Sequence, residues 1–242
     1  MPNNPTYFEL LKACDQPGCP VCRLEQQAVG RFLDHLFYES VNDGETRAHL
    51  RASLGFCREH TELLLETGLG DALGMAIIYQ DVLGTVLKRL TKKKYPSSEG
   101  TVLARLLGRI PTELAYTLER VMHAVSPNEP CLACQQREST ERVVISVLTA
   151  QIQDPELVAA FARTDGLCLP HLKQAITQVK DEALLAELLK LELGKLKSLH
   201  AELAEYKRKS DYRYLKDGFG PEGNAWRRAA GLVSGGRSEL NK

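Results

Sequence analysis

The sequence predicts an all-α protein with two pseudo-repeated helical modules, each clamped by a metal site of three cysteines and one histidine, and a C-terminal arm. Leu, Ala, Glu, Lys and Arg dominate its long periodic segments, and this composition favours helix over strand. No segment alternates between apolar and polar residues in the manner of a half-buried strand. The most informative observation is that one cysteine–histidine pattern occurs twice in the chain.

The repeated pattern is a CxxC pair followed, after a long spacer, by a CxxH pair. The spacer is 34 residues long in the first copy and 33 in the second. The two copies comprise Cys19, Cys22, Cys57 and His60, and then Cys131, Cys134, Cys168 and His171. Zinc is commonly held by four such ligands at the corners of a tetrahedron. We therefore expect two closed Cys3His sites, one in each copy.

The residues around the ligands also match between the copies. Asp43 and Asp154 each lie 14 residues before the cysteine of a CxxH pair, and each opens a short apolar-periodic stretch. Both are expected to be helix N-caps. Gly55 and Gly166 follow these stretches, at the place where a left-handed glycine commonly ends a helix. The similarity therefore indicates an internal duplication larger than the ligand pairs.

A long helix completes each module. One is expected over 70–90 and the other over 181–207. The apolar face expected of the first consists of Leu73, Ile77, Leu83, Val86, Leu87 and Leu90. A polar stretch with a lysine run and Pro-Ser-Ser interrupts the periodicity after the first of them. These features divide the chain into a first metal-binding module at 1–93, a linker at 94–104, a second metal-binding module at 105–207 and a C-terminal arm or tail at 208–242.

The length of the spacer predicts how the first site closes. A helix from Cys22 to about Val41 would run outward by roughly 28 Å, at about 1.5 Å per residue. A second helix from Glu45 to Leu54 would return by roughly 15 Å, and extended residues would cover the remainder. We therefore expect a helical hairpin that brings Cys57 beside Cys22.

The ligand pattern favours zinc and leaves alternatives. Paired cysteines in a reducing compartment are more typical of metal ligands than of disulfides. We expect one Zn²⁺ in each of the two sites; the alternatives are a [4Fe–4S] cluster with one histidine ligand and a set of buried or redox-active thiols. Cys14 stands outside both copies. We expect a buried apolar residue there, with an additional ligand or a redox-sensing thiol as the alternatives.

The sequence contains no catalytic motif. HExxH, GxSxG and the phosphate loop GxxxxGK(S/T) are all missing from it. A complete set of four protein ligands is also typical of structural rather than catalytic zinc. We therefore favour a non-enzymatic protein, a scaffold or adaptor whose partner is another protein or a second copy of the chain.

Composition argues against several other classes. Lys and Arg together number 31, as do Asp and Glu, and a net charge of zero disfavours a nucleic-acid partner. No run of about 18 apolar residues predicts a membrane span. The first residues lack the basic and apolar regions of an export signal, so we expect a cytoplasmic protein.

The C-terminal arm is rich in aromatic residues with basic neighbours. The aromatic residues are Tyr206, Tyr212, Tyr214, Phe219 and Trp226. We expect the arm to pack back across a module. A docking peptide for a partner and an aromatic, basic surface for nucleic acid are the alternatives.

Several short phrases of the sequence resemble an uncharacterised family of bacterial cytoplasmic proteins. They are CPVCRLE, YESVND, RASLGFCREH, GLCLPH and the late KSDYRY and AWRRA segments. The resemblance covers nearly the whole chain, and its most specific part is the GFCxxH element. It implies a helical protein that binds metal through the eight ligands named above, and it brings no reaction with it. Cys14 lies outside the family's pattern.

Overall fold

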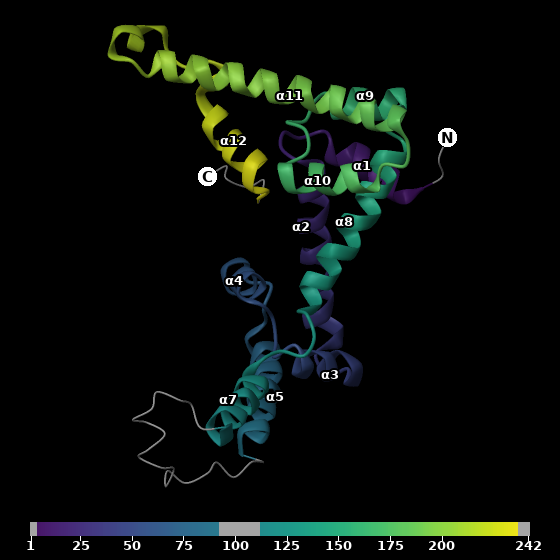
Figure 1. Ribbon diagram of the computed structural model, residues 1–242, viewed down its shortest axis with the longest axis vertical. Coiled ribbons are helices and arrows are strands. Elements are labelled where there is room, and N and C mark those ends of the chain that lie inside the picture. The colour runs from purple at the N-terminus through teal and green to yellow at the C-terminus, as the bar shows by residue number, and fades with distance from the viewer. Residues whose placement is uncertain (1–3, 92–111, 237–242) are drawn as a thin grey trace. The chain divides into compact units, whose positions relative to one another are not determined.

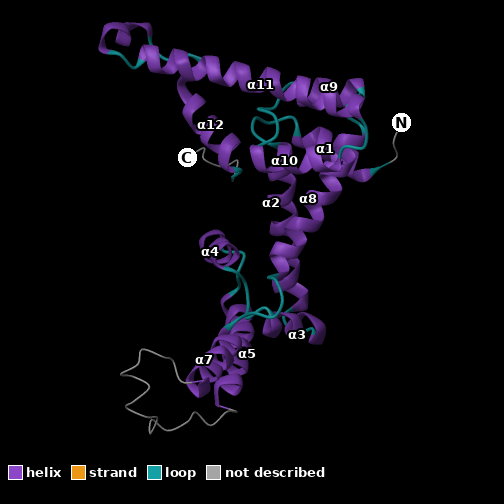
Figure 2. Ribbon diagram, in the orientation of Figure 1, coloured by secondary structure: helices purple, strands orange, loops and turns teal. Residues whose placement is uncertain are grey.

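A computed structural model of the chain describes residues 4–91 and 112–236. Within these ranges every regular element is a helix, as Figure 1 and Figure 2 show. The predicted all-α fold class is therefore confirmed. The predicted linker at 94–104 lies outside the described residues.

The helices range from single turns to the 28-residue α11. In chain order the elements are α1 (Pro5–Ala13), α2 (Pro20–His35), the π-helical turn η1 (Leu36–Ser40), α3 (Gly44–Ala52), α4 (Arg58–Thr67), α5 (Ala72–Thr91), α7 (Thr112–Val125), α8 (Leu132–Ala150), α9 (Pro155–Phe161), α10 (Leu169–Gln178), α11 (Glu182–Lys209), the 3-10 helices η2 (Tyr212–Asp217) and η3 (Pro221–Asn224), and α12 (Ala225–Ser234). No single described helix is long and apolar enough to cross a membrane. Taken together, α8 and α9 are long and apolar enough by length and composition alone, but the two helices are bent by 120° relative to each other.

The chain forms two compact units that do not coincide with the predicted modules. The first unit joins residues 1–28 to residues 137–242, and the second comprises residues 29–136. The boundary falls inside α2 and inside α8, because these two long helices each contribute to both hydrophobic cores. The modules expected at 1–93 and 105–207 are therefore each divided between the two units.

The core of the first unit contains the opening turns of α2 and the later turns of α8. Val21 and Leu24 of α2 lie in one buried cluster with Ile145 and Leu148 of α8. Phe161, at the end of α9, is fully buried in the same cluster. Each such side chain contributes about 1.5–3 kcal/mol when it is removed from water, so this core fixes the helices that carry four of the eight ligands.

The core of the second unit contains the later turns of α2 and the first turn of α8. Val29 and Leu33 of α2 share a buried cluster with Ala133 of α8 and with residues of α3 and α5. Gly74 of α5 lies so close to η1 that a Cβ atom there would be 2.8 Å from the Phe37 ring. The glycine therefore allows α5 to pack directly against η1.

The helix predicted over 70–90 is present as α5, but its apolar face was predicted only in part: Ile77 packs against the second core. Ile78 and Val82 are buried, whereas Leu73, Leu83 and Leu87 are 69%, 59% and 61% exposed. Periodicity alone offered two overlapping apolar faces on this helix, and packing against α3 and η1 buries the one that carries the β-branched residues Ile78 and Val82.

The local features that matched between the two copies are confirmed. Asp43 Oδ1 accepts a hydrogen bond of 2.7 Å from the Thr46 amide at the start of α3. Asp154 Oδ1 caps α9 in the same way, with bonds of 3.0 Å from two amides. Gly55 and Gly166 have φ of 87° and 94°, so both occupy the left-handed region before a ligand cysteine. The symmetry of the modules as a whole stays a prediction.

The C-terminal residues form a folded cap within the first unit. After two 3-10 turns the chain enters α12, which packs against α11 and α10. Ala225 and Leu232 of α12 are buried with Leu199 of α11. The predicted packing of the arm back onto the rest of the chain is therefore confirmed for the described residues.

Replacing Gly166 by alanine should destabilise the protein. A left-handed backbone costs a residue with a Cβ about 1–2 kcal/mol, and this Cβ would also lie 2.7 Å from Glu192 Oε2. Gly84→Ala in α5 is the matched control, because a Cβ there meets nothing within 4 Å. It should stabilise the helix by about 0.5–1 kcal/mol. Urea unfolding of both variants measures the difference, and equal free energies of unfolding would contradict it.

Candidate metal centres

The eight predicted ligands lie in two clusters of four, each of which could hold a metal ion. The outer centre, named for the distant segments that it joins, comprises Cys19, Cys22, Cys168 and His171. The inner centre comprises Cys57, His60, Cys131 and Cys134. Within each cluster the ligand atoms all lie within 4.8 Å of one another. Each centre thus takes its CxxC pair from one copy of the pattern and its CxxH pair from the other.

The expected hairpin that would bring Cys57 beside Cys22 is therefore wrong. After α3 the chain turns sharply, with positive φ at Leu54 and Gly55, and the Gly55 amide donates a 2.8 Å hydrogen bond to the Leu50 carbonyl. The residues expected to extend back toward Cys22 are consequently used in a compact turn. Cys57 stays in the second unit, where the start of α8 supplies the other CxxC pair.

In the outer centre the histidine nitrogen lies close to all three sulfurs. His171 Nδ1 is 3.1 Å from Cys168 Sγ. The same nitrogen is 3.4 Å from Cys19 Sγ and 3.4 Å from Cys22 Sγ. The Cys22 and Cys168 sulfurs are 3.7 Å apart. All four residues are buried.

The inner centre has nearly the same geometry. His60 Nδ1 is 3.1 Å from Cys57 Sγ and 3.4 Å from Cys134 Sγ. Its distance to Cys131 Sγ is 3.7 Å. The Cys57 and Cys134 sulfurs are 3.6 Å apart. His60 and Cys131 are buried, whereas the other two ligands are partly exposed.

Both ligand sets fit one tetrahedral ion. Zinc–sulfur bonds of about 2.3 Å and zinc–nitrogen bonds of about 2.0–2.1 Å place the corners of the tetrahedron about 3.5–3.8 Å apart. The separations above, 3.1–3.7 Å, lie at or slightly inside this range. All the cysteines are free thiols, so no disulfide competes with a metal for them.

Two helix N-termini converge on each centre. Cys19 directly precedes α2 and Cys168 is the N-cap of α10, while Cys131 directly precedes α8 and Cys57 is the N-cap of α4. Neither N-cap cysteine makes a capping hydrogen bond through its side chain, so the sulfur remains available to a metal. The partial positive charge of a helix N-terminus stabilises a thiolate relative to a thiol. The arrangement therefore lowers the cost of deprotonating the ligands.

Two carboxylates contact His171 through Nε2, the ring nitrogen that points away from the three sulfurs. His171 Nε2 lies 2.9 Å from Glu141 Oε1 and 3.3 Å from Glu25 Oε1. A carboxylate at this nitrogen fixes the ring and makes the other nitrogen a better ligand. Burial is the main cause of a raised pKa at Glu25. Sequence reasoning missed both residues, although Glu25 follows Cys22 by three positions on α2 and so shares its helix face.

Protons compete with a metal ion for the outer centre. Burial lowers the pKa of His171, but its hydrogen bonds with Cys19, Cys22 and Glu25 raise that pKa to about 12. The hydrogen bond with Cys19 lowers the pKa of Cys168, but the hydrogen bond with Cys22 and burial together raise that pKa to about 12. A metal ion that binds here must therefore displace protons from the ligands.

A buried arginine positions the CxxC pair of the outer centre. Arg23 donates hydrogen bonds to the carbonyls of Ala13, Gln16 and Pro17, in the loop that leads from α1 into α2. The Gly18 amide donates a 2.8 Å hydrogen bond to an aspartate just before the CxxH pair. The loop before the ligands is therefore held from both sides.

A histidine performs the corresponding task at the inner centre. His49 of α3 lies 2.9 Å from Glu129 Oε2 through Nδ1 and 3.1 Å from the Pro130 carbonyl through Nε2. The Asn128 amide also donates a 2.8 Å bond to the Ala52 carbonyl. These contacts tie the approach to Cys131 to α3. The sequence pattern did not reveal them, because the partners lie about 80 residues apart.

The CxxH loop of the outer centre is held by α11. Glu192 Oε1 accepts a 2.9 Å hydrogen bond from the Leu167 amide. Its other oxygen is buried and has no hydrogen-bond partner among the described residues. Lys195 donates to the carbonyls of Ala162 and Thr164. Burial raises the pKa of Glu192 to about 7.

The remaining candidate features do not join either centre. Cys14 is fully buried, as expected of an apolar core residue, and burial raises its pKa to about 11.

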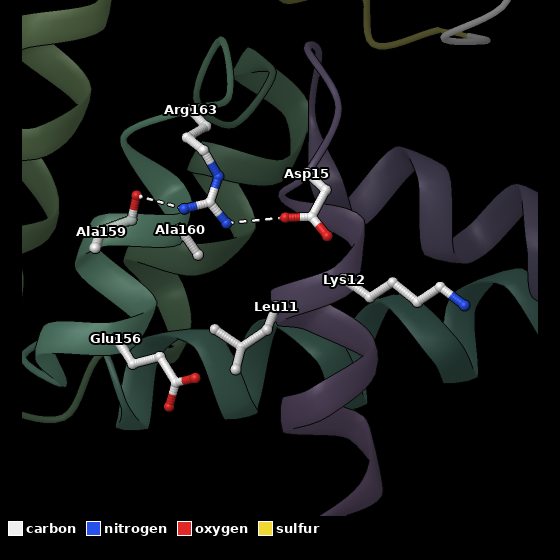
Figure 3. A pocket seen from close by; sticks show the side chains of 7 residues that line it. All are labelled: Leu11, Lys12, Asp15, Glu156, Ala159, Ala160 and Arg163. Atoms are coloured by element: carbon white, nitrogen blue, oxygen red, sulfur yellow. Dashed lines mark hydrogen bonds and ion pairs between the residues drawn. The ribbon is translucent and has the colours of Figure 1, made fainter.

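Figure 3 shows a surface hollow between α1 and α9. Its volume is about 410 Å³, and Arg163 on its rim pairs with Asp15 at 2.9 Å. Four arginines and lysines of the arm also pair with carboxylates: Arg208, Lys209, Arg213 and Arg228.

The fold and the two centres define a class: an all-helical protein with two Cys3His clusters. The chain belongs to a family of unknown function, DUF6062, whose model matches residues 10–239. It is similar to the "Uncharacterized 23.9 kDa protein in xynA 3'region" of Caldicellulosiruptor sp. (strain Rt8B.4), with 26% identity over 224 residues, 90% of this chain and 95% of that protein. No solved structure matches the chain. The resemblance to an uncharacterised family is confirmed.

Paired substitutions test the exchanged ligand pairs. Cys22→Ser with His171→Ala removes two ligands from one centre and should abolish one equivalent of bound zinc. Cys22→Ser with Cys57→Ser removes one ligand from each centre and should abolish both. Elemental analysis of the purified variants measures the difference. Sites closed within each copy of the pattern would give the reverse result, and that would contradict the structure.

Glu192 should make stability depend on pH. Its pKa rises from about 4.5 in the unfolded chain to about 7 in the folded protein, so the folded state holds an extra proton between these values. Stability should therefore fall by about 3 kcal/mol as the pH rises from 4.5 to 7. Glu192→Gln should remove this slope. Urea unfolding of the unchanged protein and the variant at the same pH values isolates the contribution of Glu192, because protonation of the metal ligands affects both proteins equally. An unchanged slope of stability against pH in the variant would refute the role of Glu192.

Proposed function

We propose that this chain is a non-enzymatic zinc protein in which two structural Cys3His sites hold distant helices together, and that it serves as a scaffold or adaptor. The observation that carries the proposal is the closed ligand set at the meeting point of two helix N-termini in each centre. Four protein ligands leave a zinc ion no open position for a substrate. A structural zinc ion supplies about 10–16 kcal/mol of apparent binding energy, coupled to folding.

The separations between ligand atoms favour zinc over an iron–sulfur cluster. In a [4Fe–4S] cluster each protein ligand binds a different iron atom, so the ligands stand farther apart than they do around one ion. The measured distances of 3.1–3.7 Å match a single tetrahedral ion. The cluster remains the second candidate because the ligand types alone suit both.

The location and the partner belong to the same proposal. We place the protein in the cytoplasm, where unpaired cysteines persist as thiols, and we propose a protein partner or a second copy of the chain. Arg208, Lys209 and Arg228 of the arm pair with carboxylates, and this supports the view that nucleic acid is not the partner, because cations paired in this way are less available to phosphates.

Elemental analysis with an ultraviolet–visible spectrum tests the proposal on the full chain. We expect two equivalents of zinc and no visible absorbance. A brown protein with a broad visible band after anaerobic purification would replace zinc by a cluster, and protein without tightly bound metal would overturn both readings.

The structural role has a test of its own. His60→Ala and His171→Ala should each lose one equivalent of zinc and lower the melting temperature, because a missing ligand weakens the coupling of metal binding to folding. A variant that keeps its melting temperature but loses a chemical activity would contradict a purely structural role.

A further inference from the structure

We propose that the inner centre is a thiol modification site: a hydroperoxide oxidises Cys57 and Cys134 to a disulfide and the bound metal ion leaves, while the outer centre stays intact. The inference rests on the proposed function, because it requires metal-bound thiolates in both centres. Three observations support it: the difference in exposure between the centres, the cover over the outer centre and the short distance between the two sulfurs.

The two centres differ in the exposure of their sulfurs. All three cysteines of the outer centre are buried, with exposed fractions of 8% or less. In the inner centre Cys57 and Cys134 are partly exposed, whereas Cys131 and His60 are buried. Oxidation of thiolates follows their accessibility to the oxidant. A small peroxide therefore reaches one edge of the inner ligand set.

The C-terminal cap covers the outer centre. A Cβ on Gly235, just after α12, would lie 3.4 Å from Cys168 Sγ and 3.3 Å from Pro170 Cγ. Arg228 of α12 pairs with Asp165 at 3.1 Å, and the same carboxylate accepts the Gly18 amide. The cap is therefore attached to both loops that present the outer ligands, and it lies directly over a ligand sulfur.

The two accessible sulfurs are also close enough to bond. Cys57 Sγ and Cys134 Sγ are 3.6 Å apart. A disulfide bond is about 2.05 Å long, so each sulfur must move by less than about 1 Å. Cys57 is the N-cap of α4 and Cys134 lies in the first turn of α8, so the disulfide would join the starts of two helices.

The reaction balances with a hydroperoxide as the only co-reactant. The first thiolate attacks the peroxide oxygen, which gives a sulfenic acid and releases hydroxide or alkoxide. The second thiolate attacks that sulfur, displaces hydroxide and forms the disulfide. Each sulfur loses one electron and the O–O bond accepts both. Cys131 and His60 would then be the only ligands left to hold a metal ion at this centre, so a bound ion would be released.

Zinc release from the full chain tests the proposal. The protein is first analysed for metal, and hydrogen peroxide is then added with a chromogenic zinc chelator present. We expect one equivalent to appear at least about tenfold faster than the second. Mass spectrometry of the digest should show a peptide pair joined through Cys57 and Cys134. Equal release rates, or a first disulfide within the outer centre or between Cys131 and Cys134, would overturn the proposal.

A matched pair of variants on α12 tests the role of the cap. Leu232→Asp places a charge in a buried contact, whereas Val233→Asp changes a neighbouring side chain that is 60% exposed. If the cap protects the outer centre, the Leu232→Asp variant should release both equivalents of zinc rapidly. The Val233→Asp variant should release one equivalent rapidly and the second slowly, like the unchanged protein. Each variant must first hold two equivalents and show a normal helical spectrum. Equal protection in both variants would overturn the role of the cap.

The metal analysis keeps the two hypotheses distinguishable. Protein that never holds two equivalents refutes the proposed function. Protein that holds two equivalents and loses them together keeps the proposed function and refutes the assignment of the inner centre as the modification site.

Discussion

The structure depends on the convergence of helix ends at two clusters of soft ligands. Each cluster collects two helix N-termini that the chain reaches at widely separated points. The outer centre joins Cys22 to Cys168 across 146 residues, and the inner centre joins His60 to Cys131 across 71. No run of local contacts brings such segments together. The donor sets therefore supply what secondary structure alone does not: a fixed meeting point between the two halves of the sequence.

The nesting of the inner centre inside the outer one has an entropic consequence. Without the inner centre, closing the outer one confines a loop of 146 residues. When the inner ligands have met, the open chain consists of 35 residues from Cys22 to Cys57 and 34 from Cys134 to Cys168. Each halving of a flexible loop lowers its closure cost by about 0.6 kcal/mol. The inner centre thus makes the outer one easier to form, and the favourable order is from the inside outward.

Sequence rules identified the ligands and the local structure around them because these depend on short-range chemistry. The caps at Asp43 and Asp154 and the left-handed glycines before the CxxH pairs follow from backbone hydrogen bonding and sterics within a few residues. Local chemistry does not decide which CxxC pair joins which CxxH pair, because pairs from the same copy and pairs from different copies satisfy a tetrahedral ion equally well. The choice depends on whether the chain after α3 extends or turns, and a single residue, Leu54 with φ of 55°, marks the turn.

The ligands are repeated but their surroundings are not, and this separates the two centres. Three positions after the second CxxC cysteine stand Glu25 in the first copy and Arg137 in the second. Seven positions after it stand Val29 and Glu141. Both carboxylates reach His171 of the outer centre, so the exchange of pairs concentrates them at one site. With a zinc ion in each centre, the imidazole of the outer one gains donor strength from these acceptors. That centre is also the one beneath the C-terminal cap, so the two occurrences of the ligand pattern form one shielded centre and one with two partly exposed sulfurs.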